Sequence, residues 1–302
     1  MISYPASFGD SIVLSLFTVE LDSIRETGRL GSGDDEFNLP TDIAGGFSAG
    51  GLKRIFITDR VQQRVDVYND SLRFLYATGS TDLEDPLSAV EPPSGGLFVF
   101  SALKRRIYRL NRDGRLQDSL LPDLSPPFSA NVKLKNAPLA SLICVDADND
   151  RVALVSTSGR VMEQYQKGLG CFLRRPVDAA PVADGMAVLD PGNSRLIVLS
   201  RNGAGIREYR DGALGKARFF LVTGFGYLVF GEKGEALALS GELLPFARFS
   251  LNESFDAGVC LSGNRIFLVS GRKKTVREYK IGVRRTGEVR GMAMALSGGP
   301  RK

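Results

Sequence analysis

Histidine is absent from this chain of 302 residues, and its absence limits the chemistry that the side chains can perform. Without an imidazole there is no His-ligated zinc or iron, and no Ser–His or Cys–His pair to generate a nucleophile. A pH switch based on imidazole is excluded as well. The catalytic groups that remain are carboxylate pairs, a lysine or tyrosine base, and a metal ion held by oxygen ligands.

The segment DADND resembles the start of a calcium-binding loop, because it carries alternating carboxylates at Asp146, Asp148 and Asp150. Arg151 stands where such a loop needs glycine, and Thr157 stands where it needs a closing glutamate. The segment DPGNSR, residues 190–195, occupies the same place in a repeat described below. Asp and Asn favour turns because they bond their own backbone. We therefore interpret both segments as turns between the first two strands of a unit, and we predict no metal site.

The three cysteines form a poor disulfide framework, because the set is odd and sparse. Cys144 and Cys260 lie in apolar runs and are expected to be buried as small hydrophobic residues. Cys171 follows Gly-Leu-Gly and is expected to be exposed, but nothing near it marks a nucleophile. The glycines of residues 224–234 do not lead into a helix, which argues against a phosphate or dinucleotide loop. No cofactor is predicted.

Composition indicates a chain able to bury a large core, with 43% hydrophobic residues and a mildly basic net charge of +5. No apolar run reaches the length of a membrane helix, about 18 residues. Residues 11–19 lack the basic start of a signal peptide and predict a strand instead. The free cysteines favour the cytoplasm, and an exported mature form is the alternative.

A β-rich unit recurs along the chain at a spacing near 40 residues. Each copy is an apolar strand, a polar tip and an alternating strand, which is typical of a hairpin. The copies cover residues 54–70, 95–114, 150–168, 194–212, 226–241 and 264–282. Their first strands begin near Ile55, Leu97, Val152, Leu196, Leu228 and Ile266. This period with β character predicts an all-β propeller, whereas a sandwich need not repeat and a solenoid has a shorter period.

Four strands per unit, here A to D from the inside outward, match a propeller blade. We expect the hairpins to be strands B and C, with A in the apolar stretch before each. Residues 11–24 predict a hairpin without an A strand, and residues 289–297 an A strand without a hairpin. Joined in space, they would close the propeller and remove its free edges. We therefore predict one domain, residues 1–302, with seven blades favoured and six as the alternative.

Residues 31–70 resemble an NHL repeat. The matching features are Phe37 and Pro40 at its opening, and an apolar run that ends at Asp59 and is followed by Arg64 and Val65. Gln62 and Gln63 stand near the place of the family's Asn-His pair. The other units resemble weaker copies. WD and Kelch repeats fit less well, since the chain has no tryptophan. The resemblance implies a propeller, and because NHL propellers include RNA binders it also implies RNA as a candidate ligand.

The predicted B–C tips are basic, with thirteen cations against three acids. The cations are Arg60, Arg64, Lys104, Arg105, Arg106, Arg160, Arg201, Arg207, Lys233, Arg272, Lys273, Lys274 and Arg277. All B–C tips of a propeller emerge on one face, so a basic ring is predicted there. The D–A connections on that face are acidic at Asp34, Asp35, Glu36, Asp82, Glu84, Asp85, Glu253 and Asp256, and could neutralise it.

A basic sector should survive where the neighbouring connections are not acidic. The sequence places two such sectors, one at Arg174 and Arg175, the other at Arg272, Lys273 and Lys274 with Arg284, Arg285 and Arg290. The cluster Lys104, Arg105 and Arg106 is predicted to be weaker, because it lies near Glu84 and Asp85. These nine residues at 104–106, 272–274, 284, 285 and 290 are the candidate binding residues.

Three functions remain open. The first is a non-catalytic platform for a protein or peptide partner, since the fold repeats and no catalytic constellation is visible. The second is binding of RNA or another polyanion through the basic tips. The third is a metal-dependent hydrolase or lactonase without histidine, for which the inner strands offer only Asp42, Asp184 and Asp256 as acids.

Overall fold

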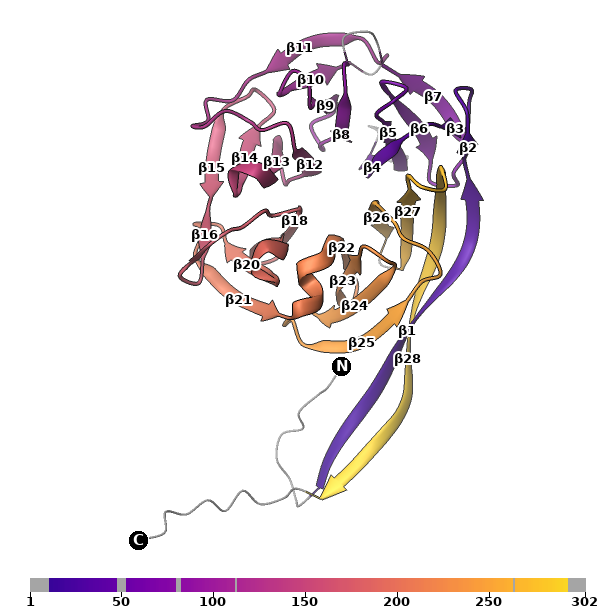
Figure 1. Cartoon of the computed structure of the whole chain (residues 1–302), viewed down its shortest axis with the longest axis vertical. Coiled ribbons are helices and arrows are strands. Elements are labelled where there is room, and N and C mark those ends of the chain that lie inside the picture. The colour runs from indigo at the N-terminus through magenta and orange to yellow at the C-terminus, as the bar shows by residue number, and fades with distance from the viewer. Residues whose placement is uncertain (1–10, 48–52, 80–82, 112, 263, 293–302) are drawn as a thin grey trace.

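The protein is a six-bladed β-propeller whose blades surround a central channel (Figure 1). The computed structural model describes residues 11–47, 53–79, 83–111, 113–262 and 264–292. Within these ranges there are six four-stranded antiparallel sheets and two two-stranded pairs. In each blade, strand A lines the channel and strand D lies at the rim. Six blades is the predicted alternative, and the favoured number of seven is not found.

Blades 1 to 3 follow one another directly along the chain. Blade 1 contains β4 (Pro40–Phe47), β5 (Lys53–Asp59), β6 (Arg64–Asn69) and β7 (Phe74–Thr78). Blade 2 contains β8 (Pro86–Val90), β9 (Leu97–Ser101), β10 (Arg106–Leu110) and β11 (Leu116–Leu120). Blade 3 contains β12 (Val132–Asn136), β13 (Ser141–Asp146), β14 (Arg151–Ser156) and β15 (Val161–Tyr165).

Blades 4 to 6 complete the circle. Blade 4 contains β18 (Asp178–Val182), β19 (Gly185–Asp190), β20 (Arg195–Ser200) and β21 (Gly205–Arg210). Blade 5 contains β22 (Ala217–Thr223), β23 (Gly226–Gly231), β24 (Glu235–Ser240) and β25 (Pro245–Ser250). Blade 6 contains β26 (Ala257–Ser262), β27 (Arg265–Ser270), β28 (Thr275–Met292) and β1 (Ser11–Thr27).

Short elements occupy the connections between blades. Two-residue strands pair as β2 (Arg29–Leu30) with β3 (Glu36–Phe37) and as β16 (Lys167–Gly168) with β17 (Cys171–Phe172). Three 3-10 helices are η1 (Ala147–Asn149), η2 (Pro191–Asn193) and η3 (Gly212–Lys216). No helix of the described residues is long and apolar enough to cross a membrane.

The two ends of the chain pair in one sheet, as predicted, but in a different way. Strand β1 is a single strand that forms the outer edge of blade 6, and Val19 lies opposite Val283 of β28. Residues 11–24 contain no glycine, proline or asparagine to make a tip, so the predicted hairpin is wrong. Residues 289–292 continue β28 rather than starting an inner strand, and residues 293–297 lie outside the described residues. One shared blade therefore replaces the predicted seventh.

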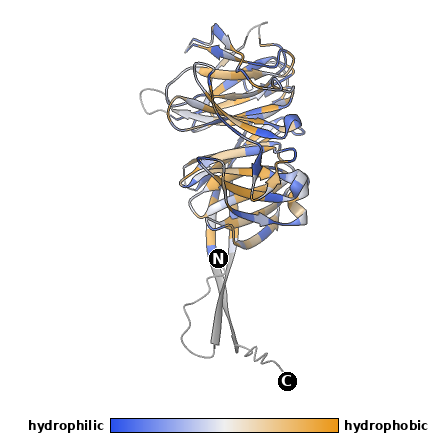
Figure 2. Ribbon diagram, turned by 90° about the vertical axis from the view of Figure 1, so that its left-hand side faces the viewer, coloured by the Kyte–Doolittle hydropathy of each residue, from blue (hydrophilic) through white to orange (hydrophobic). Residues whose placement is uncertain are grey.

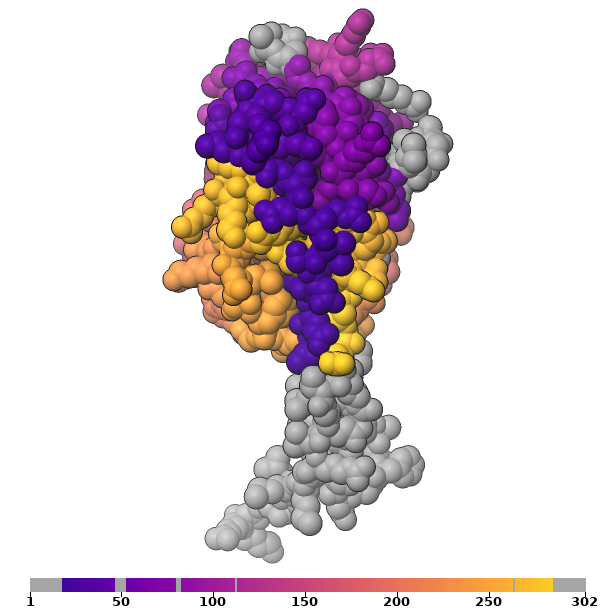
Figure 3. All heavy atoms as spheres, turned by 90° about the vertical axis from the view of Figure 1, so that its right-hand side faces the viewer, coloured from indigo at the N-terminus to yellow at the C-terminus, as the bar shows by residue number. Residues whose placement is uncertain are grey.

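The paired strands β1 and β28 also extend beyond the disc as a two-stranded ribbon (Figure 1). Seen from the rim, the described part of β1 lies along β28 over the side of blade 6 (Figure 3). Long strands reach far because each residue adds about 3.3 Å. The two ends of β28 are therefore far apart, which matters for the predicted basic sectors.

The repeat is more regular than the predicted hairpins suggested. The B strands begin at Lys53, Leu97, Ser141, Gly185, Gly226 and Arg265, which are 44, 44, 44, 41 and 39 residues apart. In blades 3 and 4 the predicted hairpins are strands C and D, not B and C. There the C strands RVALVS and RLIVLS are as apolar as B strands elsewhere, and their D strands alternate like C strands. Because these C strands resemble B strands in their sequence pattern, the predicted hairpins of blades 3 and 4 were assigned one strand too early in the blade.

The hydrophobic core lies between neighbouring blades. The described residues form six buried clusters, one at each junction between adjacent blades. At the junction of blades 2 and 3, for example, Phe100 meets Phe128 edge-on with ring centroids 5.8 Å apart. Apolar residues follow the strands, and hydrophilic residues gather on the loops at both faces (Figure 2). The strands are thus a rigid support, and the loops carry the groups available for binding.

Candidate functional site

Strand order assigns every loop to one of two faces. The B–C turns and D–A connections emerge together, and we name this side the B–C face; the A–B and C–D turns form the opposite face. DADND and DPGNS are therefore B–C turns, not A–B turns, and each contains a 3-10 helix, η1 or η2. Arg160, Arg201 and Arg207 lie in or next to C–D turns on the opposite face. The cations that were predicted to form one ring therefore lie on both faces.

Three B–C turns share a polar motif, Asp-x-x-Asn/Gln-x-Arg, which we call the turn lock. It occupies residues 59–64, 146–151 and 190–195. In blade 3, Nη2 of Arg151 lies 2.7 Å from Oδ2 of Asp146. In blade 4, Nε of Arg195 lies 2.8 Å from Oδ2 of Asp190. All four side chains are fully buried, so each charge depends on its partner.

The middle residue of the lock binds the connection that enters the blade. The Asn193 side-chain amide donates to the Phe172 carbonyl and to Asp190, both at 2.8 Å. Asn149 does the same in blade 3, donating to the Pro127 carbonyl at 2.9 Å and to Asp146 at 2.9 Å. In blades 3 and 4 the middle residue of the lock therefore fastens a D–A connection to a B–C turn.

Blade 1 uses the same residue types differently. Asp59 accepts the main-chain N–H groups of Asn38 at 2.6 Å and Leu39 at 3.1 Å. Gln62 donates to the Glu36 carbonyl at 2.9 Å. Arg64 pairs instead with Asp66, at 2.8 Å. Burial raises the pKa of Asp66 to about 7, against the attraction of Arg64.

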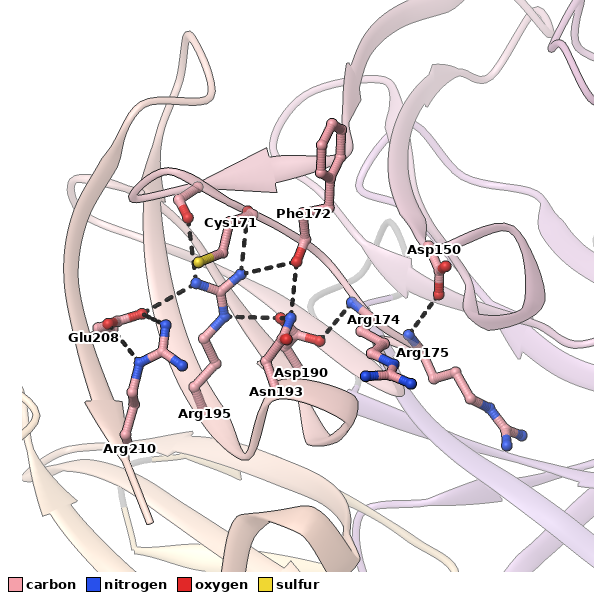
Figure 4. A network of polar contacts seen from close by, with 11 residues as sticks. Asp150, Cys171, Phe172, Arg174, Arg175, Asp190, Asn193, Arg195, Glu208 and Arg210 are labelled. Atoms are coloured by element: carbon pink, nitrogen blue, oxygen red, sulfur yellow. Dashed lines mark hydrogen bonds and ion pairs between the residues drawn. The ribbon is translucent and has the colours of Figure 1, made fainter. Parts of the chain in front are cut away.

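The connection 166–177 between blades 3 and 4 is held most thoroughly (Figure 4). Arg195 donates to the carbonyls of Gly168 at 3.2 Å and of Cys171 and Phe172 at 3.4 Å. The Arg174 N–H donates to Asp190 at 2.8 Å, and the Arg175 N–H donates to Asp150 at 2.7 Å. One buried cation and two carboxylates therefore fix both halves of the connection.

This rigid connection presents an aromatic ring beside two free cations. The Phe172 ring points away from the network (Figure 4) and is 71% exposed. Arg174 and Arg175 are exposed, and no ion pair of either guanidinium is found among the described residues. Exposed aromatic and arginine side chains are the types most enriched in binding hot spots. The basic sector predicted at Arg174 and Arg175 is thus present as two exposed guanidinium groups without an ion pair in the described part of the chain.

An apolar cavity continues the same region of the B–C face. The Asp211 N–H at the start of η3 donates to the Ser194 carbonyl after η2 at 3.0 Å, which joins the two connections. Beside η3 lies a cavity of about 370 Å³, lined mainly by apolar residues such as Leu214, Val229 and Phe249, and also by Lys216, Glu235 and Arg248. We name the connection 166–177, η2, η3 and this cavity the blade 4–5 sector.

The predicted clusters at the other tips are neutralised only in part. Lys104 pairs with Glu84 at 2.9 Å, and Lys273 with Glu253 at 2.8 Å. Arg106 donates to the Ser119 hydroxyl at 3.4 Å. Asp82, also expected to neutralise the rim, lies outside the described residues. Arg105, Arg272 and Lys274 complete the two clusters as surface cations. Two of the six cations are thus paired, and the other four have no ion pair among the described residues, so these tips keep part of their predicted charge.

The second predicted sector is not assembled. Arg272, Lys273 and Lys274 precede β28, whereas Arg284 lies ten residues along it, about 30 Å for an extended strand. Arg284 lies 3.8 Å from Glu20 of β1. The backbones of Arg285 and Arg290 continue the ribbon, and their side chains are outside the description. The sequence placed these residues together because β28 was interpreted as two separate strands.

The central channel contains a cluster of four charged side chains. Lys133 and Lys135 project from β12, Asp42 comes from β4 and Asp178 from β18. Nζ of Lys133 lies 3.8 Å from both carboxylates, and Nζ of Lys135 lies 3.1 Å from Asp178. The Ser88 hydroxyl donates to Oδ2 of Asp42 at 2.5 Å, while Oδ1 of Asp42 has no hydrogen-bond partner in the part of the chain that the structure describes.

The pKa values of this cluster are shifted in different directions. Burial raises the pKa of Asp42 against the opposing attraction of Lys133 and Lys135. It lowers the pKa of Lys133, and the like charge of Lys135 adds to that effect. For Lys135, burial is outweighed by Asp178 and Asp42, so its pKa is raised. Cavities of about 310 and 290 Å³ lie at the two ends of the channel, with Lys133 lining the first and Lys135 the second.

The three acids proposed for a hydrolase do not all meet at one site, although Asp42 and Asp256 both line the 310 Å³ cavity. Asp42 alone lies in the cluster, Asp184 is at the opposite face and pairs with Arg207 at 2.9 Å, and Asp256 pairs with Arg218 at the channel mouth. Asp178 was missed because its strand was not recognised as an A strand. No group of three potential metal ligands is found within the described ranges.

The cysteines are free, and their burial broadly follows expectation. Cys144 is buried, Cys260 half-buried and Cys171 exposed. Burial raises the pKa of the Cys144 thiol well above its usual range. These surroundings leave Cys144 as a packing residue.

Comparisons with known proteins identify the fold. No protein-family model matches the chain, and no curated protein matches it in sequence. It is similar to virginiamycin B lyase from Staphylococcus aureus, with 9% identity, a TM-score of 0.61, and coverage of 87% of this chain and 99% of the lyase. A streptogramin B lyase has 13% identity, a TM-score of 0.60 and coverage of 88% of each chain. The BBS1 N-terminal region, solved in complex with ARL6, has 10% identity, a TM-score of 0.58 and coverage of 87% and 97%.

Proposed function

We propose that this protein is a non-catalytic propeller that binds a protein or peptide partner through the blade 4–5 sector of its B–C face. The observation that carries the proposal is Phe172, exposed beside Arg174 and Arg175 on a connection held by a fully buried arginine. Burying an exposed apolar ring is favourable, and a loop already fixed in place loses little entropy on binding.

The sector also specifies the partner's chemistry. Two unpaired guanidinium groups favour carboxylates, which arginine can bind with two parallel hydrogen bonds. The cavity lined by Leu214, Val229 and Phe249 accepts an apolar side chain. A partner segment with acidic residues and a bulky apolar residue would match both features.

Two of the similar folds suggest opposite functions. BBS1 was solved with a protein partner, which supports a binding role for a propeller of this kind. The lyase is an enzyme, and a variant of it with a histidine replaced by alanine is described as catalytically inactive. The present chain has no histidine with which to carry out such chemistry. Partner binding is therefore the better supported function.

We also propose kinship with the NHL-type propellers. The support is the turn lock in blades 1, 3 and 4, together with the resemblance of residues 31–70. In each blade the lock joins the same two loops, so a common repeat accounts for it more simply than three separate origins.

Affinity capture from the native host tests the proposed function. The baits are the wild type, the triple variant Phe172→Ala, Arg174→Ser, Arg175→Ser, and Leu139→Ala. Leu139 is the matched control, because it is 84% exposed on the opposite face. We expect the triple variant to lose the partner, with affinity reduced at least about 30-fold, and Leu139→Ala to keep it. A partner retained equally by all three baits contradicts the proposal.

A further inference from the structure

The mouth of the channel on the B–C face has an unsatisfied buried acceptor. Asp42 is 3% exposed and lines the 310 Å³ cavity, yet its Oδ1 atom has no hydrogen-bond partner among the described residues. A buried carboxylate oxygen without a donor carries a large desolvation cost. The place next to Oδ1 therefore favours a hydrogen-bond donor, and above all a cation.

Beside Asp42, Lys133 favours a hydrogen-bond acceptor. Its Nζ atom is 3.8 Å from Oδ1 of Asp42 and equally far from Asp178, beyond hydrogen-bond distance from either carboxylate. Asp178 is already engaged by Lys135 and by the Phe220 N–H, both at 3.1 Å. An acceptor placed against Lys133 would therefore gain a charge-assisted hydrogen bond.

We infer that the channel mouth binds an α-ammonium group together with the carbonyl or carboxylate next to it, as found in a free amino acid and at the N-terminus of a peptide. The ammonium group donates to Asp42, and the neighbouring oxygen accepts from Lys133. The two protein atoms are 3.8 Å apart, a spacing that adjacent donor and acceptor atoms of one small group can bridge. A cavity of about 310 Å³ is at the small end of ligand sites, which suits such a group.

Residues at the rim of the cavity also favour the entry of an ammonium group. Glu232 is exposed there and has no ion pair among the described residues, while the nearby Arg218 is occupied by Asp256. An incoming ammonium group thus meets a free carboxylate first and a buried one below. This site adjoins the blade 4–5 sector at Pro176, Val177 and Ala217 but uses different charged groups, so either can fail without the other.

Calorimetric titration of the purified wild type tests the inference with four probes: glycine, triglycine, N-acetylglycine and N-acetyltriglycine. We expect glycine, triglycine or both to bind, and acetylation to weaken binding at least about tenfold, because it removes the ammonium charge. Binding of glycine alone would assign the site to free amino acids, and binding of triglycine alone to peptide termini. No saturable binding, or equal binding of the acetylated probes, overturns the inference.

Variants distinguish the contribution of Lys133 to affinity from that of Lys135. Asp42→Asn and Lys133→Met should each weaken binding of the better probe at least about tenfold. Lys135→Met is the matched control: it lies on the same strand but lines the other cavity, and it should change affinity less than about threefold. Glu232→Gln alters only an exposed side chain and should weaken binding about twofold to fivefold, which guards against misfolding of the buried variants. Equal losses for Lys133→Met and Lys135→Met would contradict the assignment.

Discussion

Two connections on the B–C face, residues 166–177 and 251–256, differ in how the charged side chains around them are paired. In the second, Glu253 pairs with Lys273 and Arg277, and Asp256 pairs with Arg218. The acids of this connection therefore neutralise the cations around it. In the first, the nearby acids Asp150 and Asp190 bind main-chain N–H groups and a buried arginine. The two exposed arginines of that connection therefore keep their charge available.

The anchoring of the two connections differs as well. Residues 166–177 are fastened by the turn lock of blade 4, which leaves the Phe172 ring exposed. Residues 251–256 are fastened by a buried ring, since Phe255 packs edge-on against Tyr279 with centroids 6.0 Å apart. A polar anchor frees an aromatic side chain for binding, whereas an apolar anchor uses it for packing.

The largest effect is expected from removing the lock of blade 4. Arg195→Met leaves Asp190 buried without its partner and should lower the free energy of unfolding by about 3–5 kcal/mol. Urea unfolding measures the loss, and hydrogen exchange should show residues 166–177 opening.

Arg151→Met provides the matched control, because it removes the equivalent pair in blade 3. It should destabilise the protein to a similar extent but leave residues 168–172, whose carbonyls Arg195 holds, protected. Equal opening of that segment in both variants would mean that the lock is not what holds it.

A smaller effect is expected in blade 1, where Arg64 pairs with Asp66. Asp66 has a raised pKa of about 7, so the folded protein binds an extra proton between about pH 4 and 7. The stability from this group is complete below pH 4 and is lost as the pH rises through 7. Asp66→Asn cannot ionise, so its advantage in Tm over the wild type should grow by about 5 °C or more from pH 5 to pH 8. An advantage independent of pH contradicts the raised pKa.

The exposed charge of the two connections can be compared with heparin as a probe. Arg174→Ser with Arg175→Ser should lower the salt concentration of elution, because fewer counterions are released. Glu253→Gln should raise it slightly, since it frees Lys273, while Arg277 stays paired with Glu26. Lys104→Ser should have almost no effect, because Lys104 is paired with Glu84. The reverse order would show that pairing at the tips does not neutralise them.

The smallest effect concerns the pair Lys273–Glu253 itself. The lysine side chain is 48% exposed, so a double-mutant cycle should give a coupling of about 0.2–1 kcal/mol. A coupling above about 2 kcal/mol would mean that this pair is as important as a buried lock.

The sequence predicted the propeller and the pairing of its ends, because strands, turns and a period near 40 residues are local signals. It did not predict six blades over seven, since the turn-free residues 11–24 were interpreted as a hairpin. Arg174 and Arg175 were found from the lack of acids near them. The turn locks were visible as Asp and Arg five residues apart at 146–151 and 190–195, but their role depends on burial. Phe172 could not be predicted, because its exposure depends on how a distant turn holds its carbonyl.

The most direct test of the central claim is site-specific photo-crosslinking in the native host, with a photoreactive residue at position 172 or at position 139. Partner binding through the blade 4–5 sector predicts a discrete adduct from position 172 that disappears when Arg174 and Arg175 are changed to Ser. Position 139, on the opposite face, should give no such adduct. An adduct from position 139 alone, or one from position 172 that persists without the two arginines, would contradict the account.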